Sequence, residues 1–270
     1  MNIAMIQVST LLGEPQKNRT LMEPYIQLAI QQGADVLVLP ETWNVGFFPK
    51  NIHELAKEAE QDDSLAWLQK IAQTYKVNVV GGSIAMKEQD KVYNRCYVFN
   101  REGAQVYSYD KIHLFSPGSE TNYFEQGKSN QIFELDGIPC AVQICYDLRF
   151  PELARGLALQ GAKILFTPAQ WPHPRSEHWL TLNRARAIEN QLYVVAVNGC
   201  GEANGVHSCG HSVMYDPFGE VLVLADEEQG VYISPVFEEK VDHVRQQIPV
   251  FVDRKPNLYR EIESKNITSE

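Results

Sequence analysis

Short runs of apolar residues alternate along the chain with longer segments in which apolar residues recur every three or four positions. The short runs at residues 35–39, 77–80, 163–167 and 192–197 are rich in β-branched and aliphatic residues. Such runs are typical of buried strands. Helical spacing is found in three further segments, at residues 18–32, 64–75 and 177–190. Ser64 is a suitable N-cap for the second of them.

Two other segments have the pattern of antiparallel hairpins. Residues 92–99 and 105–109 flank one set of turn-forming residues, and residues 212–215 and 220–224 flank the turn Asp216-Pro217-Phe218-Gly219. Parallel units combined with hairpins indicate an α/β fold in which helices cover one or two mixed sheets. Because no linker or low-complexity run interrupts this pattern, we expect one domain over residues 1–260. Residues 261–270 are expected to form a polar C-terminal tail.

Composition narrows the possible partners. Of the 270 residues 44% are hydrophobic, which is ordinary for a globular protein, and 24 basic against 34 acidic residues give a formal charge of −10. A negative field repels phosphate backbones, so we expect no nucleic-acid partner. No apolar run is long enough for a membrane span, and the N-terminus lacks the pattern of a signal peptide. Five scattered cysteines indicate a reduced, cytoplasmic protein.

Two charged residues have apolar neighbours in the sequence and are candidates for catalysis. Glu41 comes after the 35–39 run, where apolar walls would raise the pKa of its carboxyl toward that of a general base. The alternative is a solvated loop glutamate. Lys111 lies among aromatic and aliphatic residues, and its compact positive charge could stabilise an oxyanion. Its alternative is a surface lysine with a buried stem.

Cys145 is the candidate nucleophile. An apolar run leads into it, and Pro151 occupies a position typical of the first residue of a helix. A strand–turn–helix corner would place backbone N–H groups and a positive helix end near the sulfur, and both favour thiolate. The alternative is an inert buried cysteine, an interpretation that fits Cys96, Cys140 and Cys200 better.

Metal and cofactor sites are not expected. His207, Cys209 and His211 are three potential ligands within five residues, but their spacing matches no zinc pattern. The chain also lacks the glycine-rich loops that bind phosphates or dinucleotides, and the nucleophile elbow of serine hydrolases.

Three segments together resemble the nitrilase (carbon–nitrogen hydrolase) superfamily, with its Glu–Lys–Cys triad. They are LPE at 39–41, DKIHLF at 110–115 and ICYDLRFPE at 144–152, and the resemblance extends from the first strand to Tyr259. It implies a four-layer α-β-β-α sandwich of two mixed sheets flanked by helices, and assembly into a homodimer or larger homo-oligomer. It also implies an amidohydrolase in which Glu41, Lys111 and Cys145 are catalytic. The backbone N–H of Tyr146 would then help to bind the oxyanion.

Within the superfamily the chain is most similar to the omega-amidase branch, through residues 145–153, 171–176, 185–191 and 216–220. This similarity implies cleavage of the terminal amide of a small 2-oxo acid such as 2-oxoglutaramate. Deaminated glutathione, an N-carbamoyl compound and a nitrile are alternative substrates. A binding protein that keeps the fold without the chemistry is a further alternative.

Four more residues are candidates for the site. By resemblance Glu120 is an accessory glutamate near the triad, with Glu125 as a rival and a solvated loop residue as the alternative. Arg175 and Arg149 are candidates to bind the carboxylate of a small carboxylated amide. For Arg149 an ion pair with Glu152 or Asp147 is an equal alternative. Trp171 would either line the pocket or belong to the core.

Overall fold

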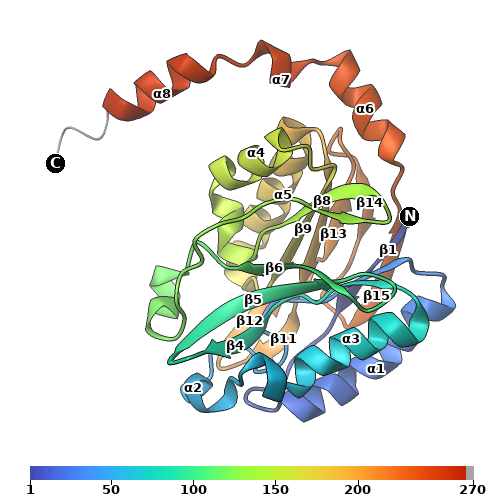
Figure 1. Ribbon diagram of the computed structural model, residues 1–270, viewed down its shortest axis with the longest axis vertical. Helices are drawn as coiled ribbons and strands as arrows, with labels where there is room; N and C mark the ends of the chain where they lie inside the picture. Colours follow the sequence, from blue (N-terminus) through green and yellow to red (C-terminus); the bar gives the residue numbers. More distant parts are fainter. Residues whose placement is uncertain (266–270) are drawn as a thin grey trace.

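Two β-sheets pack face to face in the computed structural model, which describes residues 1–265 (Figure 1). Residues 266–270 lie outside the described part. The first sheet has the spatial order β15 (Gly230–Pro235), β1 (Asn2–Gln7), β2 (Val36–Val38), β3 (Asn78–Val80), β5 (Lys91–Phe99) and β4 (Ile84–Glu88), with β6 (Gln105–Asp110) paired to β5. The second has the order β14 (Val221–Leu224), β13 (Val213–Tyr215), β10 (Tyr193–Asn198), β9 (Ile164–Ala169), β8 (Ile138–Val142) and β7 (Phe133–Leu135). Strands β11 (Cys200–Ala203) and β12 (Val206–Cys209) form a separate ribbon.

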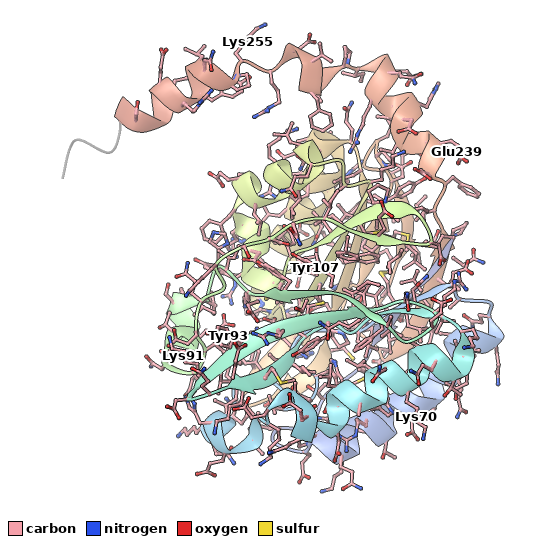
Figure 2. All side chains as sticks on the ribbon, viewed as in Figure 1. Lys70, Lys91, Tyr93, Tyr107, Glu239 and Lys255 are labelled. Atoms are coloured by element: carbon pink, nitrogen blue, oxygen red, sulfur yellow. The ribbon has the colours of Figure 1, made fainter. Side chains whose placement is uncertain are left out.

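Each sheet has a parallel centre and antiparallel edges. Strands β1, β2 and β3 are parallel, as are β8, β9 and β10. The main core lies between the sheets and combines residues of both, such as Met5 and Val38 from the first and Val142 and Val195 from the second. The side chains that fill this space are drawn in Figure 2. Burial on both faces explains why the central strands are continuous apolar runs.

Helices cover the outer face of each sheet. Helices α1 (Pro15–Gln31) and α3 (Asp63–Tyr75) pack on the first sheet, and α4 (Pro151–Leu159) and α5 (Ser176–Asn190) pack on the second. A short helix, α2 (Ile52–Leu55), lies near β4. The four-layer α-β-β-α sandwich expected from the resemblance is therefore confirmed. No helix in the described part of the chain is long and apolar enough to cross a membrane.

Most predicted elements are confirmed, with ends shifted by one to three residues, and both predicted hairpins pair as β5–β6 and β13–β14. Two details are corrected. The N-cap of α3 is Asp62, whose carboxylate accepts the Leu65 N–H, whereas Ser64 lies inside the helix. The C-terminal segment is helical as α6 (Glu238–Gln247), α7 (Val250–Asp253) and α8 (Pro256–Lys265), so residues 261–265 of the expected tail belong to a helix. These helices form an arm, with Lys255 on it outside the sandwich (Figures 1 and 2).

A close contact between backbones fixes the loop that follows β2. Gly82 has φ +63°, and a Cβ atom at this position would lie 1.9 Å from the Pro40 carbonyl oxygen. The adjacent Ser83 N–H donates to that same oxygen at 3.1 Å. Only a residue without a side chain allows this approach, which sets the backbone position of Glu41.

We expect Gly82→Ala to lower the free energy of unfolding by about 3 kcal/mol or more, because left-handed strain and a backbone clash add together. Gly137→Ala is the matched control, since Gly137 has φ +80° but open space around its Cα. Strain alone should cost the control about 1 kcal/mol. Urea unfolding of both variants measures the difference, and equal losses would contradict the role of the contact.

Candidate active site

A cavity lies where strands β2, β6, β8 and β9 end. The empty space inside it, counted out to the open mouth, is about 340 Å³. Its lining comes from both sheets and from loops that are distant in sequence: Glu41, Phe47, Phe48, Lys111, Phe115, Cys145, Tyr146, Arg149, Gln170, Trp171, Pro172 and Arg175. The structure thus brings together the three residues that the sequence nominated for catalysis.

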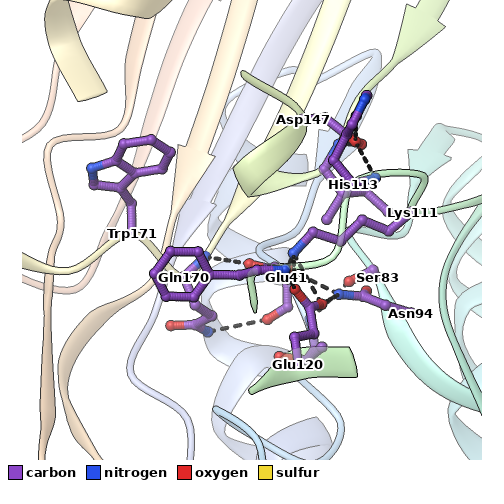
Figure 3. Close-up of polar contacts among 12 residues, drawn as sticks. Glu41, Ser83, Asn94, Lys111, His113, Glu120, Asp147, Gln170 and Trp171 are labelled. Atoms are coloured by element: carbon purple, nitrogen blue, oxygen red, sulfur yellow. Dashed lines mark hydrogen bonds and ion pairs between the residues drawn. The ribbon is translucent and has the colours of Figure 1, made fainter. Parts of the chain in front are cut away.

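Lys111 lies between two carboxylates at this cavity (Figure 3). Its Nζ is 2.8 Å from Glu41 Oε1, and 3.0 and 2.8 Å from the two oxygens of Glu120. All three side chains are almost completely buried. A solvated loop glutamate at position 41 and a surface lysine at position 111 are therefore both excluded.

Two neutral residues complete this ionic cluster, Asn94 through its side chain and Gln170 through its backbone. The Asn94 amide donates to Glu41 Oε1 at 2.9 Å and to Glu120 Oε1 at 3.1 Å, and the Gln170 backbone N–H donates to Glu41 Oε2 at 2.8 Å. Neither Asn94 nor Gln170 is predicted from the sequence. For Asn94 a signal existed, because it takes a buried position in the alternating pattern of β5, where a polar residue needs partners.

The buried charges of this cluster shift one another's pKa values. Burial works against the ammonium of Lys111, but the carboxylates of Glu120 and Glu41 raise its pKa well above the ordinary value. Burial raises the pKa of Glu120, and the negative charge of Glu41 adds to this effect against the attraction of Lys111. The rival of Glu120, Glu125, is half exposed and pairs with Lys91 at 3.0 Å, so it takes no part in the cluster.

Cys145 faces the cavity with 9% of its surface exposed, whereas Cys96 and Cys140 are completely buried. The predicted strand–turn–helix corner is confirmed, because β8 ends at Val142, the 3₁₀ turn Cys145–Arg149 follows, and Pro151 is the first residue of α4. The expectation that the thiolate is favoured is wrong. Burial raises the pKa of Cys145 well above its usual value and the charge of Glu41 raises it further, while Lys111 opposes both.

Two arginines stand at the cavity without a carboxylate partner in the described part of the chain. The Arg149 guanidinium lies 4.7 Å from the centre of the Trp171 ring, and Arg175 lies 5.5 Å from that of Phe115. Burial, together with the charge of Arg175, lowers the pKa of Arg149. The alternative for Arg149, an ion pair with Glu152 or Asp147, is absent from the described contacts. Trp171 is 2% exposed and lines the cavity, so it serves as both wall and core.

The three potential ligands near residue 209 do not form a metal site. His207 is exposed on β12, whereas Cys209 is buried with its sulfur 3.1 Å from Asn198 Nδ2. No group of three or more potential metal ligands occurs within residues 1–265.

Comparison with known proteins adds a family and its relatives. The sequence model of a family described as carbon–nitrogen hydrolase matches residues 2–246. The chain is 39% identical to 2-oxoglutaramate amidase of Bacillus subtilis (strain 168), over 95% of this chain and 98% of that protein. It is 32% identical to omega-amidase NIT2 of Homo sapiens, over 95% of each. A solved variant of an amidase from Nesterenkonia sp. AN1, with acrylamide added to its active-site cysteine, superposes with a TM-score of 0.85. The identity is 26%, over 97% of this chain and 99% of that one.

The effect of the Glu41 charge on the Cys145 thiol leads to a prediction about pH. Since the negative charge of Glu41 raises the pKa of Cys145, Glu41→Gln should move the alkylation profile of this cysteine to lower pH. The measurement is the rate of iodoacetamide labelling against pH, followed at the Cys145 peptide by mass spectrometry. Glu125→Gln removes an exposed carboxylate and should leave the profile in place. A profile unmoved or raised in Glu41→Gln would show that this charge does not act on the thiol.

Proposed function

The chain belongs to the carbon–nitrogen hydrolase family, and from this premise we propose that it cleaves the terminal amide of a small 2-oxo dicarboxylic acid monoamide, such as 2-oxoglutaramate. As a member of the family it is a hydrolase of non-peptide carbon–nitrogen bonds. The observation that carries the substrate proposal is the pair of arginines at the cavity of Cys145. The names of the bacterial and human relatives support it.

In the first half of the proposed reaction Cys145 attacks the amide carbon and Glu41 accepts the thiol proton. The hydrogen bonds to Glu41 leave it able to do so. Its carboxylate has about four acceptor positions, and Lys111, Asn94 and the Gln170 N–H occupy three of them. The fourth can take the proton. Glu41 then passes this proton to the nitrogen as the carbon–nitrogen bond breaks, and ammonia leaves a thioester on Cys145.

In the second half water attacks the thioester, and the same carboxylate takes a proton from the water. The carbon–sulfur bond breaks, the acid leaves and the proton returns to the sulfur. Both halves pass through a tetrahedral oxyanion. We assign its stabilisation to the Lys111 ammonium, which stays charged at neutral pH, and to the backbone N–H of Tyr146. Glu120 holds Lys111 in place through both of its oxygens.

Arg149 and Arg175 are suited to bind the carboxylate end of such a substrate. A 2-oxo acid presents a carboxylate, and a protein with a net charge of −10 needs a local cation to attract it. Arg149 and Arg175 lie close enough for the charge of one to lower the pKa of the other, a repulsion that a bound carboxylate would relieve. Stacking on Trp171 fixes the plane of Arg149 without using its N–H donors.

We further propose that the protein is a cytoplasmic homodimer. The C-terminal arm exposes apolar side chains, among them Val252 at 82%, and α5 and the β13–β14 turn expose Ile188 and Phe218. A second copy of the chain would remove this surface from water. The five free cysteines suit a reducing compartment.

A panel of amides with an ammonia readout tests the function. We expect the wild-type protein to have its highest kcat/KM with 2-oxoglutaramate, above deaminated glutathione, N-carbamoyl compounds and nitriles. Cys145→Ala should abolish turnover, and Lys111→Ala should lower kcat at least about 100-fold, because one oxyanion donor contributes about 3–4 kcal/mol. Wild-type protein that releases no ammonia from any 2-oxo acid amide would refute the substrate, and an active Cys145→Ala variant would refute the mechanism.

The arginines are tested by their selectivity for a charged substrate. Arg149→Gln or Arg175→Gln should raise KM for 2-oxoglutaramate about 10- to 100-fold, the cost of charged hydrogen bonds, and change little for a neutral aliphatic amide. Arg254→Gln is the matched control, because Arg254 also stacks on an aromatic ring, that of Tyr259, but away from the cavity. Equal losses with charged and neutral amides would mean that the arginines shape the cavity without binding the carboxylate.

A further inference from the structure

One buried carboxylate outside the cavity joins the two segments that carry the lysine and the cysteine. Asp147 has no exposed surface and does not line the cavity. Its Oδ2 accepts the Tyr109 hydroxyl at 2.7 Å and the Ile144 N–H at 2.9 Å. Its Oδ1 accepts the His113 N–H at 3.0 Å and lies 2.8 Å from His113 Nδ1 (Figure 3). Since a carboxylate only accepts hydrogen bonds, the His113 Nδ1 carries a proton.

The residues that donate hydrogen bonds to Asp147 lie next to Lys111 and Cys145 in the sequence. Tyr109 and His113 each lie two residues from Lys111, and Ile144 directly precedes Cys145. A second contact ties the same segments together, because the His113 ring stacks on Phe150 with their centres 3.7 Å apart. Asp147 therefore joins residues 109–113, which carry Lys111, to the nucleophile turn, the 3₁₀ turn Cys145–Arg149. The first segment begins at the end of a strand of one sheet and the second follows a strand of the other.

The nucleophile turn needs such support. Cys145 has φ +46°, a left-handed conformation that costs a residue with a side chain about 1–3 kcal/mol. The bond from the Ile144 N–H to Asp147 closes the turn around this residue, and the Asp147 N–H in turn donates to the Ile144 carbonyl at 3.0 Å. The conformation that points the sulfur at the cavity is therefore maintained by the same carboxylate.

We propose that Asp147 is a positioning residue that fixes the distance and orientation between the Lys111 ammonium and the Cys145 sulfur. It acts through the backbone on either side of them and touches no substrate. This inference rests on the proposed amidase function and deepens it, since the reaction needs an oxyanion donor at a set distance from the nucleophile. Each oxygen of Asp147 accepts one backbone N–H, from Ile144 at Oδ2 and from His113 at Oδ1, so asparagine cannot replace it. Its amide nitrogen would face another donor in either orientation.

The main test compares two buried aspartates. Asp147→Asn should lower kcat for 2-oxoglutaramate about 10- to 100-fold at 25 °C while KM changes less than threefold, because displacement of about 1 Å is enough for such a loss. Asp216→Asn is the control. Asp216 is equally buried and accepts the Phe218 and Glu220 N–H groups in the β13–β14 turn, away from the cavity. We expect this variant to lose thermal stability and to keep its kcat.

A merely structural Asp147 would behave like the control, with a lower Tm and an unchanged kcat at 25 °C, and that outcome overturns the proposal. If Asp147→Asn does not fold, Tyr109→Phe removes one of the four donors and should lower kcat about threefold to tenfold with KM unchanged. Full activity of that variant would count equally against the proposal.

A third readout separates this inference from the proposed function. Tyr109→Phe changes no charge, so displacement of Lys111 from the thiol should move the pH profile of Cys145 alkylation upward, because Lys111 lowers the pKa of this thiol. This measurement needs no substrate. If the profile moves upward but the wild-type protein has no activity on 2-oxoglutaramate, the positioning role is supported and the substrate is refuted. If the profile stays in place and the wild-type protein is active, the substrate is supported and the positioning role is refuted.

Discussion

The site depends on the burial of one ammonium between two carboxylates. Taking Lys111 out of water costs several kcal/mol, and only ionised partners at hydrogen-bond distance offset that cost. Glu41 and Glu120 provide them at 2.8 Å, but two negative charges around one positive charge leave an excess that must be stabilised as well. Asn94 offers one N–H to each carboxylate, which explains a polar side chain at the inner face of β5. The cluster is therefore a single unit whose members each need the others.

The ionic cluster lies where loops of the two sheets are joined by hydrogen bonds. Glu41 follows β2 of the first sheet, whereas its Oε2 accepts the N–H of Gln170, which follows β9 of the second. The carbonyl of Ala169 accepts the Glu41 N–H at 3.4 Å, and the Gln170 amide returns a bond to the Glu41 carbonyl. The cavity thus lies at a seam where hydrogen bonds cross from one sheet to the other. Ligand sites of α/β folds favour such strand ends, and here the ionic cluster holds the seam together.

The local sequence pattern was enough to predict secondary structure, which depends on residues close together along the chain. The apolar runs predicted the central strands and the turn residues predicted the hairpins. For Glu41, Lys111 and Cys145 the local pattern left alternatives open, and the family resemblance of three short motifs was needed to choose them. Features that depend on distant neighbours were missed or wrong. The pKa of Cys145 is raised by burial and by a glutamate that lies 104 positions earlier in the chain. The true cap of α3 differs from the expected one by two residues, a choice that depends on how the chain enters the helix. Arg149 makes no ion pair with Asp147, whose carboxylate already accepts donors from Tyr109, His113 and Ile144.

The raised pKa of Cys145 bears on when the nucleophile is activated. A nucleophile activated in advance would sit as thiolate and react with any electrophile that entered. Here the charge of Glu41 disfavours the thiolate, and in the proposed reaction the same carboxylate receives the thiol proton. Under that proposal the thiol is activated only as it attacks, since the negative charge that leaves Glu41 reappears on an oxyanion next to Lys111. A buried cluster of fixed charge can exchange one anion for another without reorganising. The rigidity that the burial of Lys111 imposes is thus the same property that the reaction requires.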